Sequence, residues 1–288
     1  MSFLSPPPLR PGDRVAVVAP SGPFDRPSFE KGLELLSRRY QPVFTERIFE
    51  AHRYLAGTDV ARSAELQAAL DDDGLRAVFA ARGGYGAMHL LPSLKLSTPK
   101  WLVGFSDFTA LHGAAQKHGW RSVHAPVLTQ LGKQSAEVVE RLFQLLERGA
   151  LPPLTGVRTV TKGTAEGPLL GGNLSVLTRL IGTRWLPELR GSVLLIEDVG
   201  EKPYRLDRMW THLQLAGLFE GVRGIVFGEF TGCDEKDYTG AEIIEGLAAR
   251  LCIPCAAGFH IGHGDVNEAV LLGANVRLDA DARTLSFP

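Results

Sequence analysis

The chain has 288 residues, of which 44% are hydrophobic and 22% are charged, and its formal net charge is −1. These values are typical of a globular protein with a substantial core. The 31 basic and 32 acidic residues nearly cancel, so the chain has no net positive charge that would attract nucleic acid or a membrane surface. No apolar run is long enough to span a bilayer, and prolines interrupt any secretory signal at the N-terminus, so we expect a cytoplasmic protein.

The first half of the chain alternates short apolar runs with helical patterns. Strands, some of them running into a turn and a helix, are expected at 13–23, 42–48, 75–87, 99–119 and 121–128. Helices are expected between them at 28–40 and 57–74. This rhythm predicts an α/β fold with a parallel sheet covered by helices on both faces.

The rhythm is lost over residues 148–167, which are rich in Pro, Gly and Thr and predict a linker or a small β segment. We therefore expect an N-terminal α/β domain at 1–150, a linker at 151–165 and a C-terminal domain at 166–288. The second domain has shorter predicted strands and ends in a predicted hairpin that turns through Asp279 to Arg283, so it is expected to be a β-rich α/β domain.

Two of the three cysteines form a C-x-x-C pattern, Cys252 and Cys255. That spacing suits redox chemistry or half of a zinc site, but there is no second pair to complete four ligands. The flanking sequence "RLCIPCAAGF" instead resembles the edge of a buried apolar strand, where a free cysteine acts as a small hydrophobic residue.

Glycine and serine residues follow the predicted strands of the first half, where α/β sheets form their sites. In "RGGYG" (82–86), consecutive glycines make a tight turn and can also aim backbone N–H groups at an anion. In "GFSD" (104–107), Ser106 stands where a strand passes into a helix. A serine there is either a helix N-cap or a nucleophile, and both interpretations stay open at this point.

A nucleophilic serine needs a base, usually histidine, and a carboxylate that orients the base. His260 and His263 lie in a glycine-rich loop after an apolar strand, and His124 follows another strand. The H-x-x-H spacing would also suit a metal, but no third ligand has a recognisable spacing, so no metal is predicted. Glu197 ends an apolar strand and is the best carboxylate, whereas the charges that follow it, Glu201, Arg205, Asp207 and Arg208, are expected to be structural or interface residues.

Eight motifs then occur in order across nearly the whole chain: "APSGP", "RGGYG", "VGFSDFTALH", "HAPVL", "GPLLGGNLSVLTRLIGT", "LLIEDVGEKPYRLDR", "GIVFGEF" and "GHGDVNEAVLLGANVRLD". In these motifs the sequence resembles the serine LD-carboxypeptidases, also called muramoyltetrapeptide carboxypeptidases, with the microcin C self-immunity hydrolases as relatives. The resemblance implies an N-terminal parallel-sheet domain, a β-rich C-terminal domain, an active site between them and a homodimer.

The resemblance also implies roles for individual residues. Ser106 would be the nucleophile, Glu197 the carboxylate and His263 the base. The backbone N–H of Asp107 and one from Gly83 or Gly84 are expected to form the oxyanion hole.

Arg82 and Asn173 are expected to bind substrate. Arg82 suits a terminal carboxylate, although pairing with a structural carboxylate is an equal alternative.

The activity that the resemblance implies is release of the terminal D-Ala from murein tetrapeptide stems through an acyl-enzyme, in cytoplasmic peptidoglycan recycling. The partner would be a small peptide, with no cofactor, nucleic acid or membrane. One alternative is a microcin-type hydrolase of a peptidyl- or aminoacyl-nucleotide, for which Trp185 and Trp210 are the candidates to stack on adenine. Another is a peptide-binding module without catalysis, which the intact serine, glutamate and histidine argue against.

Overall fold

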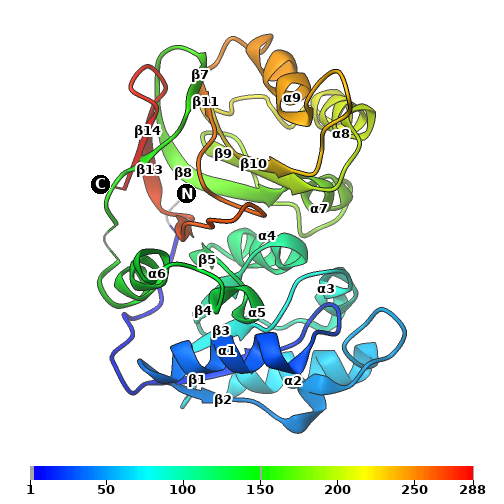
Figure 1. Ribbon diagram of the computed structural model, residues 1–288, viewed down its shortest axis with the longest axis vertical. Helices are drawn as coiled ribbons and strands as arrows, with labels where there is room; N and C mark the ends of the chain where they lie inside the picture. Colours follow the sequence, from blue (N-terminus) through cyan, green and yellow to red (C-terminus); the bar gives the residue numbers. More distant parts are fainter. Residues whose placement is uncertain (1–2, 150, 288) are drawn as a thin grey trace.

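The computed structural model describes residues 3–149 and 151–287 and contains two α/β units, each built around one sheet (Figure 1). The first unit is lower in Figure 1 and the second lies above it, with α4 of the first unit and α7 of the second facing each other between the sheets. The predicted two-domain α/β fold is confirmed.

The first sheet has six strands in the order β12-β5-β4-β3-β1-β2. Its neighbouring strands are parallel except for β12, which pairs antiparallel with β5. The strands are β1 (Arg14–Val18), β2 (Gln41–Val43), β3 (Ala77–Ala80), β4 (Trp101–Gly104), β5 (Ser122–His124) and β12 (Val270–Leu272). The central strands are buried throughout, as expected for a parallel sheet with both faces covered.

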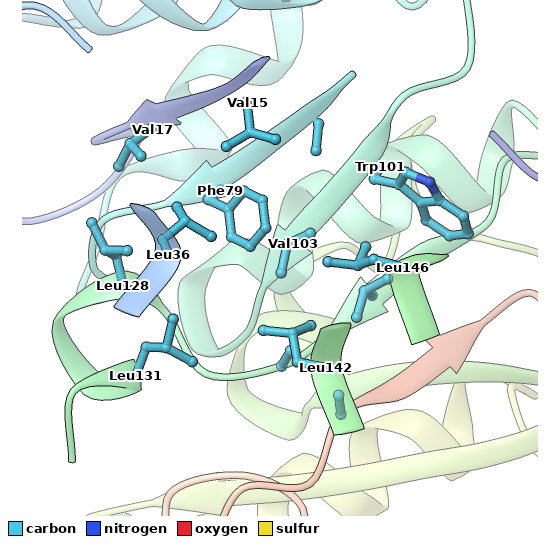
Figure 2. Close-up of a cluster of buried hydrophobic side chains, with 14 of the residues drawn as sticks. Val15, Val17, Leu36, Phe79, Trp101, Val103, Leu128, Leu131, Leu142 and Leu146 are labelled. Atoms are coloured by element: carbon cyan, nitrogen blue, oxygen red, sulfur yellow. The ribbon is translucent and has the colours of Figure 1, made fainter. Parts of the chain in front are cut away.

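Helices pack against both faces of this sheet. They are α1 (Arg26–Ser37), α2 (Asp59–Asp71), α3 (Ala87–Leu90), α4 (Thr109–Lys117), α5 (Leu128–Leu131) and α6 (Ala136–Arg148), with 3₁₀ turns η1 (Glu46–Phe49), η2 (Leu91–Ser93) and η3 (Ser106–Phe108). Asp25, Thr58 and Ser135 begin the three longest helices by accepting a backbone N–H, the ordinary role of such residues at an N-cap. Figure 2 shows leucines of α1, α5 and α6 packed onto Val15, Phe79 and Val103 of the strands.

The second sheet has eight strands in the order β6-β14-β13-β8-β9-β10-β11-β7. Strands β8 to β11 are parallel to one another, and the outer strands are antiparallel. The strands are β6 (Leu154–Thr155), β7 (Arg158–Thr161), β8 (Thr164–Asn173), β9 (Val193–Val199), β10 (Gly224–Thr231), β11 (Cys255–Ala257), β13 (Asn275–Asp279) and β14 (Thr284–Ser286). The helices of this unit are α7 (Leu174–Arg179), α8 (Pro203–Leu215) and α9 (Gly240–Ala249).

The structure differs from the expected division of the chain in two places. The segment 151–165, assigned as a linker between the domains although its composition also allowed a small β segment, contributes β6 and β7 to opposite edges of the second sheet. The segment 166–288, expected to form the C-terminal domain alone, returns to the first sheet through β12, where Val270 pairs with His124. The predicted strand at 42–48 is also shorter, because η1 begins at Glu46. The hairpin of β13 and β14 forms where the sequence predicted it.

No helix in the two described ranges combines the length and apolar composition that a membrane crossing would need.

Candidate active site between the two sheets

Ser106 stands at the carboxyl end of β4, on the turn that leads through η3 into α4. Its backbone φ is +63°, a left-handed conformation that costs energy for any residue with a side chain, and the tight packing around it holds it there. The side chain makes no capping hydrogen bond to the following turn. The N-cap interpretation of Ser106 therefore fails, because its hydroxyl is directed to a histidine instead.

That histidine is His263, whose Nε2 lies 3.0 Å from the Oγ of Ser106. On the other side of the ring, Nδ1 lies 2.6 Å from Oε2 of Glu197, a fully buried residue of β9. A carboxylate only accepts, so Nδ1–H donates to Glu197 and leaves Nε2 to accept the serine proton. The ring of Phe105 packs against the imidazole at 4.6 Å between centroids and helps fix its orientation.

The carboxylates beside His263 set its protonation. Burial lowers the pKa of His263, but the charge of Glu197, its hydrogen bond and the charge of Asp198 together outweigh burial, so the pKa lies above the ordinary value of 6.5. A raised pKa makes the imidazole a stronger base. The imidazole is largely neutral, and so able to accept a proton, only at a pH above that pKa. The arrangement can therefore accept a proton from Ser106 and hold it as imidazolium.

Asp198 is the next residue of β9 and points to the opposite face of the strand. It is buried and accepts hydrogen bonds from the amide of Asn173 and from the backbone and hydroxyl of Ser175. Burial, and then the neighbouring charge of Glu197, raise the pKa of Asp198 to about 6. Its contacts connect β9 with the end of β8 and the start of α7.

Asn173 differs from the expectation that it binds substrate. Its Oδ1 accepts the N–H of Val176 at 3.1 Å as the N-cap of α7, and its Nδ2 donates to Asp198 at 3.1 Å. The side chain is buried and is not among the described residues that line the cavity at Ser106. Both ends of the amide are used inside the protein, so Asn173 acts as a structural residue.

The glycine turn after β3 lies directly against Ser106. A side chain at Gly83 would place its Cβ 3.0 Å from the Cβ and 3.1 Å from the Oγ of Ser106. Gly84 has a φ of +107°, which favours glycine. Among the hydrogen bonds of the described residues, none uses the backbone N–H of Gly83, Gly84 or Asp107. These N–H groups are therefore available to a developing oxyanion.

The carboxylate of Asp107 connects this turn to the start of α4. It accepts hydrogen bonds from Ser21 Oγ at 2.6 Å and from the N–H of Ala87 at 2.8 Å, and burial raises its pKa. A buried arginine, Arg62, holds the other side of the turn by donating to the carbonyl oxygens of Pro20 and Gly86. The loop that carries Ser21 and the glycine turn are thus joined by side chains as well as by the sheet.

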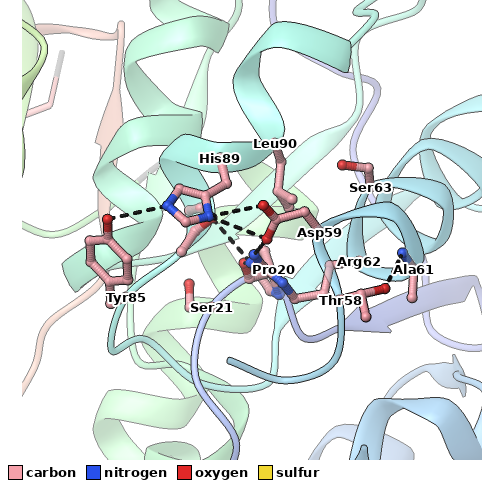
Figure 3. Close-up of polar contacts among 12 residues, drawn as sticks. Pro20, Ser21, Thr58, Asp59, Ala61, Arg62, Ser63, Tyr85, His89 and Leu90 are labelled. Atoms are coloured by element: carbon pink, nitrogen blue, oxygen red, sulfur yellow. Dashed lines mark hydrogen bonds and ion pairs between the residues drawn. The ribbon is translucent and has the colours of Figure 1, made fainter. Parts of the chain in front are cut away.

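A chain of polar contacts continues outward from Arg62, as Figure 3 shows. Arg62 pairs with Asp59 at 2.5 Å, Asp59 contacts Nδ1 of His89 at 3.1 Å, and Nε2 of His89 lies 3.2 Å from the hydroxyl of Tyr85. Tyr85 belongs to the glycine turn itself. The contacts therefore restrain the C-terminal end of the turn, at Tyr85 and Gly86.

A cavity of about 480 Å³ opens beside Ser106 and His263. The polar and charged side chains that line it are Asp25, Ser28, Arg82, Thr129, Gln130 and Lys133. Arg82 donates to the carbonyl oxygen of Pro23 and takes part in no ion pair with a carboxylate of the described residues. The expected alternative, in which Arg82 pairs with a structural carboxylate, is therefore not observed.

The loop that carries His263 is bound to the first unit by Gln134, and by Arg141 of α6, which pairs with Glu268 and donates to the carbonyl of Ala269. The side chain of Gln134, which follows α5, accepts the N–H of Asn267 at 3.0 Å and donates to the carbonyl of Asp265 at 3.2 Å. The buried side chain of Asn267 in turn accepts the N–H of Gly262 at 2.9 Å. This series of contacts fixes the position of His263, which belongs to the second unit, relative to Ser106 of the first.

Other candidates from the sequence lie outside the site. His260 pairs with Glu229 at 2.8 Å and does not share a partner with His263. His124 is fully buried in β5, and burial together with the charges of His112 and His263 brings its pKa well below 6.5. Trp210 is buried in the core of the second unit, which removes it as a surface for stacking, and Trp185 is half-buried beneath the guanidinium of Arg184.

The two cysteines of the C-x-x-C pattern differ in burial. Cys255 is buried in β11, as the apolar flanks predicted, and burial raises the pKa of its thiol to about 12. Cys252 is exposed, with a left-handed φ of +53°.

Ser106 and His263 line one cavity, and the buried Glu197 lies behind the histidine, which is the arrangement expected of a serine hydrolase. The comparisons with known proteins agree with a hydrolase. Residues 15–125 match the N-terminal domain of the LD-carboxypeptidases, and residues 166–278 match their C-terminal domain. The chain belongs to the LD-carboxypeptidase family and is a peptidase.

The similarity extends over nearly the whole length of its relatives. The murein tetrapeptide carboxypeptidase of Pseudomonas aeruginosa is 34% identical over 93% of this chain and 94% of its own length. The crystal structure of muramoyltetrapeptide carboxypeptidase from Oxalobacter formigenes matches with a TM-score of 0.85 and 28% identity, over 94% of this chain and 97% of that one. The wild-type microcin C7 self-immunity protein MccF matches with a TM-score of 0.88 at 23% identity, over 99% and 98%, which is a likeness of fold.

Proposed function

We propose that this protein is a serine carboxypeptidase that releases the terminal D-Ala from murein tetrapeptide stems by cleaving an L,D peptide bond. The observation that carries the proposal is the chain of contacts Ser106–His263–Glu197 beside a glycine turn with free N–H groups, on a cavity large enough for a short peptide. The relatives named above that act on murein tetrapeptides supply the substrate class. A place in cytoplasmic peptidoglycan recycling and a homodimeric state belong to the same proposal.

The reaction begins when His263 takes the proton of Ser106 and the serine oxygen attacks the carbonyl carbon that precedes the terminal D-Ala. The carbonyl oxygen becomes an oxyanion, held by the N–H of Asp107 and one N–H of Gly83 or Gly84. The imidazolium then gives its proton to the leaving amine, and D-Ala departs. Water, deprotonated by the same histidine, attacks the acyl-enzyme and restores Ser106.

Glu197 supports both halves of the reaction. It is buried, so its negative charge acts on the imidazolium through a medium of low polarity, and its hydrogen bond keeps Nε2 facing the serine. Arg82 provides the cation that a carboxypeptidase needs beside the scissile bond, because the terminal carboxylate would otherwise be buried without a partner.

A microcin-type hydrolase is the second candidate, favoured by the likeness of fold to MccF. In this chain, however, the two tryptophans considered for adenine are buried or half-buried.

The test is a parallel assay of purified protein on murein tetrapeptide and on an aminoacyl adenylate analogue, with Ser106→Ala as the control. Release of D-Ala by the wild type, lost by roughly 10³-fold or more in the variant, is the expected result. Cleavage of the nucleotide analogue alone would favour the microcin-type activity. Loss of activity in EDTA that zinc restores would overturn the serine mechanism.

A further inference from the structure

A fully buried histidine that takes no part in the proton transfers lies against the turn that carries Ser106. This residue, His112, belongs to α4. Its Nε2 lies 2.9 Å from the carbonyl oxygen of Gly104, the last residue of β4, and its Nδ1 lies 2.9 Å from the Oγ of Ser122 on β5. The imidazole of His112 therefore connects α4 with two strands of the first sheet.

These two contacts determine which nitrogen of His112 carries the proton. A carbonyl oxygen only accepts hydrogen bonds, so Nε2–H donates to Gly104. Nδ1 is then without a proton and accepts the hydroxyl of Ser122. Burial lowers the pKa of His112 to about 4, so the ring is neutral at neutral pH and keeps this single tautomer.

The neighbouring histidine of β5 does not share this arrangement. His124 is also fully buried, but neither of its ring nitrogens has a hydrogen-bond partner among the described residues. Its ring centroid lies 5.6 Å from that of Phe105 and 6.4 Å from that of His112, so it contributes packing. Of these two histidines, it is His112 that holds a backbone group close to Ser106.

The carbonyl of Gly104 belongs to the peptide that leads into the turn. It also accepts the N–H of Ala125 at 3.1 Å, so both of its lone pairs are used and the plane of this peptide is fixed. The next carbonyl, that of Phe105, accepts the N–H of Phe108 at 3.2 Å. Two consecutive peptides are thereby held directly before Ser106, and they maintain its left-handed φ of +63°.

The residue between Gly104 and Ser106 extends this effect to the catalytic base. The ring of Phe105 packs against the imidazole of His263, so a rotation of the peptide before Phe105 would displace that ring together with the nucleophile. We propose that His112 is a positioning residue, whose Nε2–H holds the turn that carries Ser106 in its left-handed conformation. The Oγ is thereby kept within reach of His263. This inference rests on Ser106 as the nucleophile of the proposed function.

Three substitutions of His112 separate the donor from the acceptor. His112→Gln places an amide N–H near the position of Nε2, His112→Asn reaches only the position of Nδ1, and His112→Leu supplies neither group. We measure kcat and KM for release of D-Ala, and the rate at which a serine-reactive phosphonate labels Ser106. Relative to wild type, kcat and the labelling rate should fall about tenfold with asparagine or leucine and only slightly with glutamine.

KM should change little in all three variants, because His112 is not among the described residues that line the cavity. His118→Leu is the matched control, since His118 is an exposed histidine directly after α4 whose ring contacts only the carbonyl of Ala114 among the described residues. It should leave both rates unchanged. The Tm of each variant is recorded, and the comparison of glutamine with asparagine does not require the leucine variant to fold.

Equal rates for His112→Gln and His112→Asn, or losses that follow Tm instead of the donor, would overturn the positioning role. A folded His112→Leu whose kcat is within twofold of wild type would overturn it as well. Labelling of Ser106 without release of D-Ala would refute the proposed function alone, because the order of the labelling rates still decides the role of His112. A wild-type protein that is not labelled at Ser106 would overturn both.

Discussion

Replacing Gln134 tests whether the contact between the two units positions the catalytic histidine. Gln134→Leu keeps the approximate volume of the side chain but removes both hydrogen bonds to the loop that carries His263. Each such bond contributes about 0.5–1.5 kcal/mol, so the loop loses about 1–3 kcal/mol of positional stabilisation. If that loss is expressed in the catalytic step, kcat falls about 5- to 150-fold.

The assay is release of D-Ala from murein tetrapeptide, together with the rate at which a serine-reactive phosphonate labels Ser106. Both rates should fall while KM changes little, because Gln134 is not among the described residues that line the cavity. Gln144→Leu is the control, since Gln144 lies on α6 and, among the described residues, its amide bonds only to Glu140. A kcat within twofold of wild type, or a loss confined to KM, would refute the positioning role of Gln134.

Three further outcomes follow from the site. His263 acts as a base only when it is neutral, and the charge of Glu197 raises its pKa despite burial, so kcat/KM should rise with pH through a midpoint above 6.5. Glu197→Gln should lower that midpoint, and a pH–rate profile with an unchanged midpoint would assign the midpoint to another group. Gly83→Ala should lower kcat about 10²-fold without a comparable loss of Tm, because the Cβ of the alanine would lie 3.1 Å from the Oγ of Ser106. Wild-type kinetics in this variant would show that the turn shifts to accommodate the Cβ at no cost to the reaction. Arg82→Ala should cost about 2–4 kcal/mol in kcat/KM on the tetrapeptide and much less on its C-terminal amide, whereas equal losses on both would remove Arg82 from substrate binding.

The arrangement of the chain was largely predictable because it rests on local patterns. Apolar strands that end in glycine or serine, and helices with apolar periodicity, identified the sheet and the strand ends that carry Gly83 and Ser106. The pairing of Ser106 with His263 and Glu197 was not predictable from such patterns, because three residues far apart in the sequence carry no local sign of contact. Resemblance to a family supplied that grouping, and the structure supplies its distances.

Some residues were missed or assigned a wrong role because local sequence patterns do not predict tertiary contacts. Gln134, Asp25 and Lys133 look like ordinary polar surface residues, and only the packing of α1, α5 and the 260–270 loop brings them to the site. Asn173 did carry a usable signal, since an asparagine before a helix is a typical N-cap, but its place within a family motif outweighed that signal. The threonines of 159–161 likewise favoured the small β segment, the alternative that the sequence left open beside a linker.

The position of β12 in the chain has a consequence for biosynthesis. Strand β5 is the bare edge of the first sheet until residues 270–272 have been made, because β12 is the strand that pairs with it there. A nascent or truncated chain that stops near residue 150 therefore exposes an unpaired edge beside the strand of Ser106, and such edges invite aggregation. The same late segment brings His263, so completion of the first sheet and acquisition of the catalytic base occur together, and an unfinished chain has neither.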